Sequence, residues 1–156
     1  MVLLIVAALA VVSGRSQAQS FADGLQAYDG GDTRASAEIW RGLSEAGNAE
    51  AQAALAMLHS GGEGVPFDMR RAAALYERTA KQGNVDAQLN LGDFYARGAG
   101  VRRDLTAAHM WLGLAAAQGR TWAEARRRAI ARRMSVEAVA EAERRARAWR
   151  PIKETP

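Results

Sequence analysis

The sequence lacks cysteine entirely, which excludes disulfide bonds, thiolate catalysis and cysteine-based zinc sites. It has only two histidines, His59 and His109, so a site built from histidine ligands would bind metal weakly. Only three prolines occur in 156 residues, and aromatic residues make up 6%. Alanine dominates the apolar residues, and since it has the highest helix propensity, the composition favours an all-α protein of one-domain size.

No apolar run is long enough to span a bilayer as a helix. The longest, VLLIVAALAVV, covers residues 2–12 and is followed by Ser16-Gln17-Ala18. This order of an apolar segment and small residues predicts a signal peptide at 1–18, with cleavage and export to the periplasm or beyond. Because no Lys or Arg precedes the run, a buried N-terminal helix and an uncleaved anchor remain alternatives.

The charge is divided unevenly along the chain. Residues 19–100 contain 7 basic and 11 acidic side chains, whereas residues 101–156 contain 13 basic and 6 acidic ones. The exported chain is therefore acidic at one end and basic at the other. Nucleic acid is not expected as a partner, because the sequence indicates export and does not interleave aromatic with basic residues.

A repeat of 36 residues organises the middle of the chain. When residues 49–84 are aligned with residues 85–120, 11 of the 36 positions are identical, whereas unrelated sequences would share about 2–4. Within this alignment LAMLHSGGEGVPFD (55–68) lies over LGDFYARGAGVRRD (91–104). The pattern predicts a repeat domain over 19–120, with units at about 21–48, 49–84 and 85–120.

Each unit is predicted to form two helices. In its second half, apolar or small residues recur at helical spacing, as in Ala108, Trp111 and Leu112. Acceptor side chains suited to capping the first turn precede the helices: Asp32, Asp68 and Asp104 before the second helices, Asn48 and Asn84 before first ones. Glycines suited to the left-handed C-terminal cap close the second helices: Gly47, Gly83 and Gly119.

The glycine-rich loop at 97–104 is predicted to turn the chain and not to bind phosphate. A dinucleotide-binding fingerprint needs a preceding strand and a third glycine, but Arg103 stands at that position. A P-loop needs Gly-Lys-Ser/Thr, which is absent. Gly98 and Gly100 are therefore expected to shape the backbone between two helices.

The residues of the last unit resemble a known family. The motif comprises Leu91, Gly92, Tyr95, Gly98, Gly100, Val101, Asp104, Ala108, Trp111 and Gly119. It resembles the Sel-one-like repeats (SLRs), a tetratricopeptide-like class of helical repeat, and the preceding unit departs from it at Ala56, His59 and Leu75. The resemblance implies an all-α, right-handed α-solenoid of helical hairpins, with about three repeats plus a C-terminal helical cap. It also places His59 at a packing position, so we expect a core histidine.

Residues 121–150 do not follow the repeat. They predict two basic helices, separated near Ser135, that cover the last hydrophobic face of the solenoid as a capping hairpin, with residues 151–156 as a tail. All four tryptophans lie on predicted apolar faces and are expected in the core: Trp40, Trp111, Trp122 and Trp149. Arg126, Arg127 and Arg128 are a candidate patch for an anionic partner, the alternative being a solvated helix surface with Glu124–Arg128 as an ion pair.

The sequence favours a non-enzymatic protein-interaction module, an adaptor or scaffold at the bacterial envelope. No catalytic, cofactor-binding or metal-binding group is predicted. The resemblance implies that first helices line a concave face, where a protein or peptide would meet Glu50, Met57, Asp86, Asn90, Asp93 and Arg97. A solvated face is the alternative for these residues. The other functions considered are an envelope enzyme such as a hydrolase, and a peripheral binder of anionic or membrane surfaces through the arginine-rich cap.

Overall fold

The computed structural model describes residues 19–152, which contain eight α-helices and no strand. The predicted signal peptide at 1–18 and residues 153–156 of the predicted tail lie outside the described residues. The helices are α1 (Phe21–Asp29), α2 (Thr33–Glu45), α3 (Ala49–Gly61), α4 (Met69–Lys81), α5 (Val85–Arg97), α6 (Leu105–Ala117), α7 (Thr121–Ala131) and α8 (Val136–Ala148).

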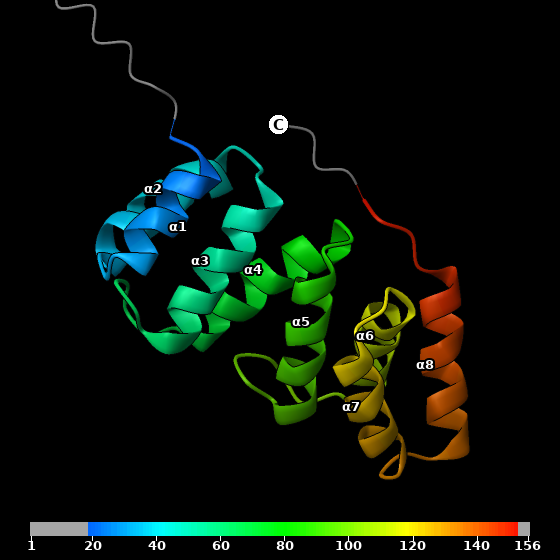
Figure 1. Cartoon of the computed structure of the whole chain (residues 1–156). Coiled ribbons are helices and arrows are strands. Elements are labelled where there is room, and N and C mark those ends of the chain that lie inside the picture. The colour runs from blue at the N-terminus through cyan, green and yellow to red at the C-terminus, as the bar shows by residue number, and fades with distance from the viewer. Residues whose placement is uncertain (1–18, 153–156) are drawn as a thin grey trace, which may run out of the picture.

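The helices form an α-solenoid, as predicted. The three consecutive pairs α1–α2, α3–α4 and α5–α6 pack as hairpins, and each hairpin packs against the next (Figure 1). The predicted caps are confirmed: Asp32, Asp68 and Asp104 each accept a hydrogen bond from a first-turn N–H of the following helix. Asn48 and Asn84 do the same for α3 and α5, so polar side chains define where most helices begin.

Buried glutamines link successive hairpins. The Gln88 side chain is fully buried; its Oε1 accepts from Gln118 Nε2 at 2.8 Å and its Nε2 donates to the Ala80 carbonyl at 3.3 Å. Gln52 accepts from Gln82 one repeat earlier, at 2.9 Å. Gln52 Nε2 likewise donates to the Ser44 carbonyl at 3.3 Å. The bonds between glutamines join the two halves of one hairpin, and the bonds to carbonyls fix each hairpin on the preceding one, so that the buried amides have partners.

The hydrophobic core is divided into clusters between neighbouring hairpins. One surrounds Trp40, whose ring stacks on Phe21 with centroids 5.6 Å apart. A second spans α3 to α6, and a third joins α5 and α6 to α7. Every cluster is therefore shared by adjacent units, as expected when one hairpin cannot bury its apolar faces alone.

The C-terminal cap differs from the predicted hairpin. Both helices form, but α8 packs against α6 and barely touches α7 (Figure 1). Trp149 meets Trp111 edge to face at 6.3 Å, and the Ile152 N–H donates to the Lys81 carbonyl at 2.9 Å. The end of α8 is therefore anchored on α6 and α4, which leaves α7 and α8 apart on either side of α6.

The expectation that Trp122 lies in the core is wrong, since 60% of it is exposed. The buried residues of α7 are Ala123 and Ile130, so its packing face passes beside Trp122. Trp122 instead lies under the guanidinium of Arg126, at 5.3 Å from the ring centroid. The predictions for Trp40 and Trp111 are confirmed, and Trp149 is partly buried against Trp111.

Candidate functional site

A groove of about 490 Å³ runs across the first helices of the three hairpins, α1, α3 and α5. α1 contributes Phe21, Leu25, Tyr28 and Asp29; α3 contributes Glu50, Ala53, Ala54 and Met57; α5 and its cap contribute Asn84, Asp86 and Asn90. Trp40 and Tyr76 from the second helices complete the lining. The solenoid thus brings together residues that are far apart in the sequence.

Exposed apolar side chains and carboxylates share this groove. Leu25 is 41% exposed and Met57 38%, although large apolar residues are usually buried in a fold of this size. Glu50 and Asp86 stand in the first turns of α3 and α5, one repeat apart. The groove therefore presents an apolar centre beside a negative end.

The aromatic residues at the groove are fixed by their neighbours. Tyr76 is buried and meets Phe94 edge to face at 5.3 Å, and burial raises the pKa of its phenol to about 12. The Tyr28 hydroxyl donates to Glu63 Oε2 at 2.9 Å, a bond that raises the Tyr28 pKa. Both phenols are neutral at neutral pH, so the carboxylates determine the charge of the groove.

The structure gathers four of the six residues predicted for peptide binding and separates the other two. Glu50, Met57, Asp86 and Asn90 line the groove. The Asp93 side chain, only 16% exposed, forms ion pairs with Arg97 and with Arg126 of α7. The two ends of α5 therefore have different surroundings, because α7 lies beside its second half.

Sequence reasoning missed the contribution of α1. The first unit has a shortened loop, so its first helix is offset by 32 residues from α3, not by 36: α1 ends at residue 29 and α3 at 61. At this offset Leu25 corresponds to Met57, and both are exposed in the groove. Gly24 corresponds to Ala56 of α3 and, one 36-residue repeat further, to Gly92 of α5. Both glycines lie where an added Cβ would collide with the facing helix. Allowing for the short loop would have revealed Leu25.

The three arginines of the predicted anionic-partner patch do not form one patch. Arg126 pairs with Asp93, Arg127 with Glu124 and Glu143, and Arg128 with Glu124 at 2.7 Å. Arg127 and Arg128 share Glu124, whereas Arg126 points to Asp93 on α5. The acidic partners offset much of the positive charge that the sequence RRR displays.

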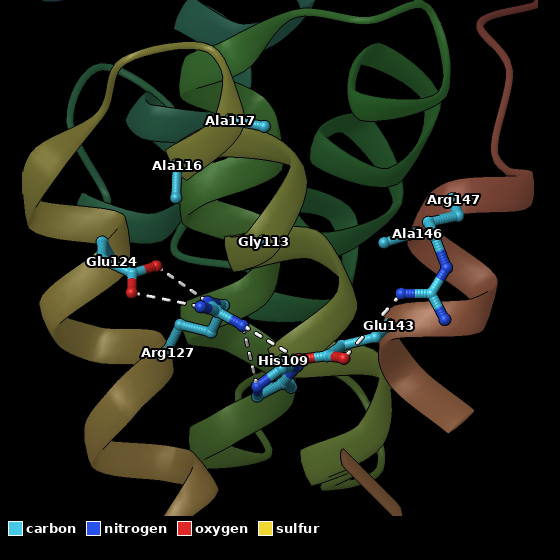
Figure 2. Close-up of a pocket in the computed structure, with 9 residues that line it drawn as sticks. All are labelled: His109, Gly113, Ala116, Ala117, Glu124, Arg127, Glu143, Ala146 and Arg147. Carbon is cyan, nitrogen blue, oxygen red and sulfur yellow. Dashed lines mark hydrogen bonds and ion pairs between the residues drawn. The ribbon is translucent and has the colours of Figure 1, made fainter. Parts of the chain in front are cut away.

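A second pocket, of about 550 Å³, lies between α7 and α8 over α6 (Figure 2). Arg127 lies at its centre, with two hydrogen bonds to Glu124 of 2.8 and 3.1 Å, a 3.6 Å ion pair to Glu143 and a 3.4 Å contact with His109 Nε2. Arg147 lies 3.8 Å from Glu143. This network connects α6, α7 and α8 where α7 and α8 do not pack directly.

The protonation states of Glu124 and His109 follow from their contacts in this pocket. Hydrogen bonds from Arg127 and Arg128 lower the pKa of Glu124 to about 2. Burial, and then the charge of Arg127, lower the pKa of His109, which is 2% exposed. A neutral imidazole that accepts from Arg127 at Nε2 is consistent with both. Glu124 is ionised and hydrogen-bonded to arginines, and His109 is buried. These features favour a role in connecting the helices over a role in acid–base catalysis.

Three further points concern His59, metal ligands and membrane-spanning helices. His59 is buried as expected, with Nδ1 3.2 Å from the Pro66 carbonyl. Among residues 19–152, no group of three or more His, Asp or Glu side chains is arranged to bind a metal ion. None of the helices in that part of the chain is both long and apolar enough to traverse a bilayer.

Fold and groove together define the class of protein: an α-solenoid repeat protein with a groove along its first helices. The sequence model of the Sel1 repeat matches residues 49–84 and 85–119. Residues 49–119 therefore consist of two Sel1 repeats, and the resemblance noted from the motifs is confirmed. The helix pair α1–α2 precedes the matched repeats and extends the same solenoid.

The solved structures that share this fold include two repeat proteins. One is c5321, a protective antigen present in uropathogenic Escherichia coli strains that displays an SLR fold; it has a TM-score of 0.78 and 24% identity over 83% of this chain. The other is a Sel1 repeat protein from Oxalobacter formigenes, with a TM-score of 0.68 and 24% identity over 84% of this chain. The matched regions span only 28% and 54% of those chains. No curated protein matches the sequence.

Proposed function

We propose that this chain is a non-enzymatic adaptor that binds an extended segment of another protein in the groove across α1, α3 and α5. Sel1 repeats are generally protein–protein interaction modules and typically non-catalytic, which supports the broad assignment. The observation that carries the specific proposal is the exposure of Leu25 and Met57 beside Glu50 and Asp86 in one groove. Exposed apolar groups gathered in a concavity are typical of a recognition surface.

The chemistry of the groove indicates the kind of segment it accepts. A large apolar side chain of the ligand would cover Leu25 and Met57, and a neighbouring Lys or Arg would meet Glu50 and Asp86. Asp86 is already 2.5 Å from Arg120, in a pair whose side chains are 60% and 49% exposed. Because exposed ion pairs are weak, a ligand cation can replace Arg120 at little energetic cost.

Selection from a random peptide library tests this proposal. The chain from residue 19 onward, immobilised, is expected to enrich peptides that carry Lys or Arg next to a large apolar residue. The selected peptides should protect Met57 and the backbone of α3 and α5 in hydrogen exchange. Enrichment of acidic peptides, or protection confined to α7 and α8, would contradict the groove as the binding site.

We also propose that the protein works at the cell envelope. The support is the order of apolar run and small residues at 2–18. Cleavage is expected after Ala18, so N-terminal sequencing of protein from the periplasmic fraction should read Gln19-Ser20. Recovery of a chain with an intact Met1 in the cytoplasm would refute export.

A further inference from the structure

Arginines without a carboxylate partner gather on one edge of the solenoid. They are Arg70 and Arg71 at the start of α4, Arg102 and Arg103 between α5 and α6, and Arg132 and Arg133 after α7. The loops that join α3 to α4, α5 to α6 and α7 to α8 follow one another along the lower side of Figure 1. We call these six residues the arginine edge. Among the described residues, none of them forms an ion pair.

The backbone brings two of these arginines together. The loop carrying Gly100 packs so closely on the start of α4 that a Cβ at Gly100 would overlap the Met69 carbonyl and approach the Arg70 nitrogen. Arg70 and Arg102 consequently line one shallow depression of about 380 Å³, together with Gly98 and Val101. The glycine conformation thus brings two arginines from different repeats to one depression.

Large apolar side chains project from the same edge. Phe67 is 63% exposed in the α3–α4 loop, and Val136 is 82% exposed at the start of α8. Phe67 and Arg103 occupy equivalent positions in successive loops: each Cβ lies beside the first loop glycine, at 3.2 and 3.3 Å from a Cβ built there. Successive loops of this type therefore carry an aromatic residue and a cationic residue at the same position.

The acidic residues of the α3–α4 and α5–α6 loops accept hydrogen bonds from groups other than the arginines of the edge. Asp68 and Asp104 each accept from a backbone N–H in the first turn of α4 and α6, at 3.0 Å. Glu63 accepts from the Tyr28 hydroxyl. Among the described residues these carboxylates form no ion pair with the arginine edge, whereas the arginines of α7 and α8 are mostly paired with Glu124, Glu141 and Glu143.

We propose that the arginine edge contacts a bilayer containing anionic phospholipid. Guanidinium groups bind phosphate through paired hydrogen bonds, and a row of them across three loops meets several headgroups at once. Phe67 and Val136 enter the interfacial layer beside those headgroups. The depression is open and shallow, which suits an extended surface better than one enclosed soluble anion. The contact leaves the groove across α1, α3 and α5 free.

Vesicle co-sedimentation of the full chain tests this proposal. The probes are vesicles of phosphatidylcholine alone and vesicles in which roughly a quarter of the lipid is phosphatidylglycerol, which carries a negative surface potential. The edge variant combines Arg70→Gln, Arg102→Gln and Arg103→Gln. The control variant combines Arg41→Gln, Arg144→Gln and Arg145→Gln, which removes the same charge from exposed positions on α2 and α8. Because both keep residues 1–18, binding by that segment cancels in the comparison.

We expect the edge variant to bind the anionic vesicles at least tenfold more weakly than the parent chain. The control variant should lose much less, and both should keep the parent melting temperature. Phe67→Ser should weaken binding further without a change in charge. Equal losses in the two variants, or a parent chain that does not prefer anionic over neutral vesicles, would overturn the proposal. Binding of soluble poly-glutamate in place of vesicles would assign the edge to an acidic protein.

Discussion

Replacement of Gly100 by valine is expected to lower the free energy of unfolding by at least about 3 kcal/mol. Gly100 has a φ of +68°, a conformation in which a β-branched residue is strained. A Cβ there would also overlap the Met69 carbonyl, which belongs to the backbone of the preceding repeat and cannot rotate away. Strain and overlap add, so thermal melts should show a loss of roughly 10 °C or more.

Gly119→Val is the matched control for this prediction. Gly119 also has a positive φ, +93°, but nothing lies within 4 Å of the position its Cβ would take. This variant should carry the conformational strain alone, about 1–2 kcal/mol. If the two variants melt together, the contact between the Gly100 loop and α4 contributes nothing to the stability of the solenoid.

The sequence predicted the fold well because the features that define each repeat act over short stretches of the chain. A capping aspartate or asparagine acts on backbone groups three residues away, and a closing glycine on its own dihedral angles. The repeat then placed Asp32, Asp68 and Asp104 in equivalent positions, and one inference covered three helices. Packing between adjacent units followed from the same period.

The arginine-rich cap was predicted less well because its partners are distant in sequence. Arg120 pairs with Asp86 and Arg126 with Asp93, each about one repeat earlier. Only the stacking of α7 beside α5 makes these residues neighbours. The position of α8 could not be predicted from the repeat either. It depends on the contact of Trp149 with Trp111, and Trp149 lies in a part of the chain that does not repeat.

The candidate groove was predicted in part, less well than the repeat and better than the arginine-rich cap. Its residues on α3 and α5 were accessible from the 36-residue period, and Glu50, Met57, Asp86 and Asn90 do line it. Asp93 and Arg97 were included because helical spacing continues along α5, although the groove does not. Leu25 was missed because the shortened first loop changes the register of α1. The helical period therefore predicts which face of a helix is exposed. It does not predict how far along the helix the groove extends.

The sharpest test of the groove is charge reversal at its negative end. Glu50→Lys combined with Asp86→Lys is expected to weaken binding of a selected basic peptide by more than tenfold, or about 1.4 kcal/mol. The reversal removes two attractive charges and adds two repulsive ones where the peptide cation would lie. The melting temperature should change little, because the side chain of Asp86 is 60% exposed and its pair with Arg120 is weak.

Glu38→Lys combined with Glu45→Lys provides the matched control. Both residues are exposed on α2, outside the groove lining, and the change in net charge is the same. A tenfold loss in this control as well would mean that the peptide responds to net charge and not to the groove. If affinity survives reversal at Glu50 and Asp86 but collapses when Arg126, Arg127 and Arg128 are neutralised, the peptide binds the cap. In that case the exposure of Leu25 and Met57 would need a different explanation, since the groove would then have no peptide ligand.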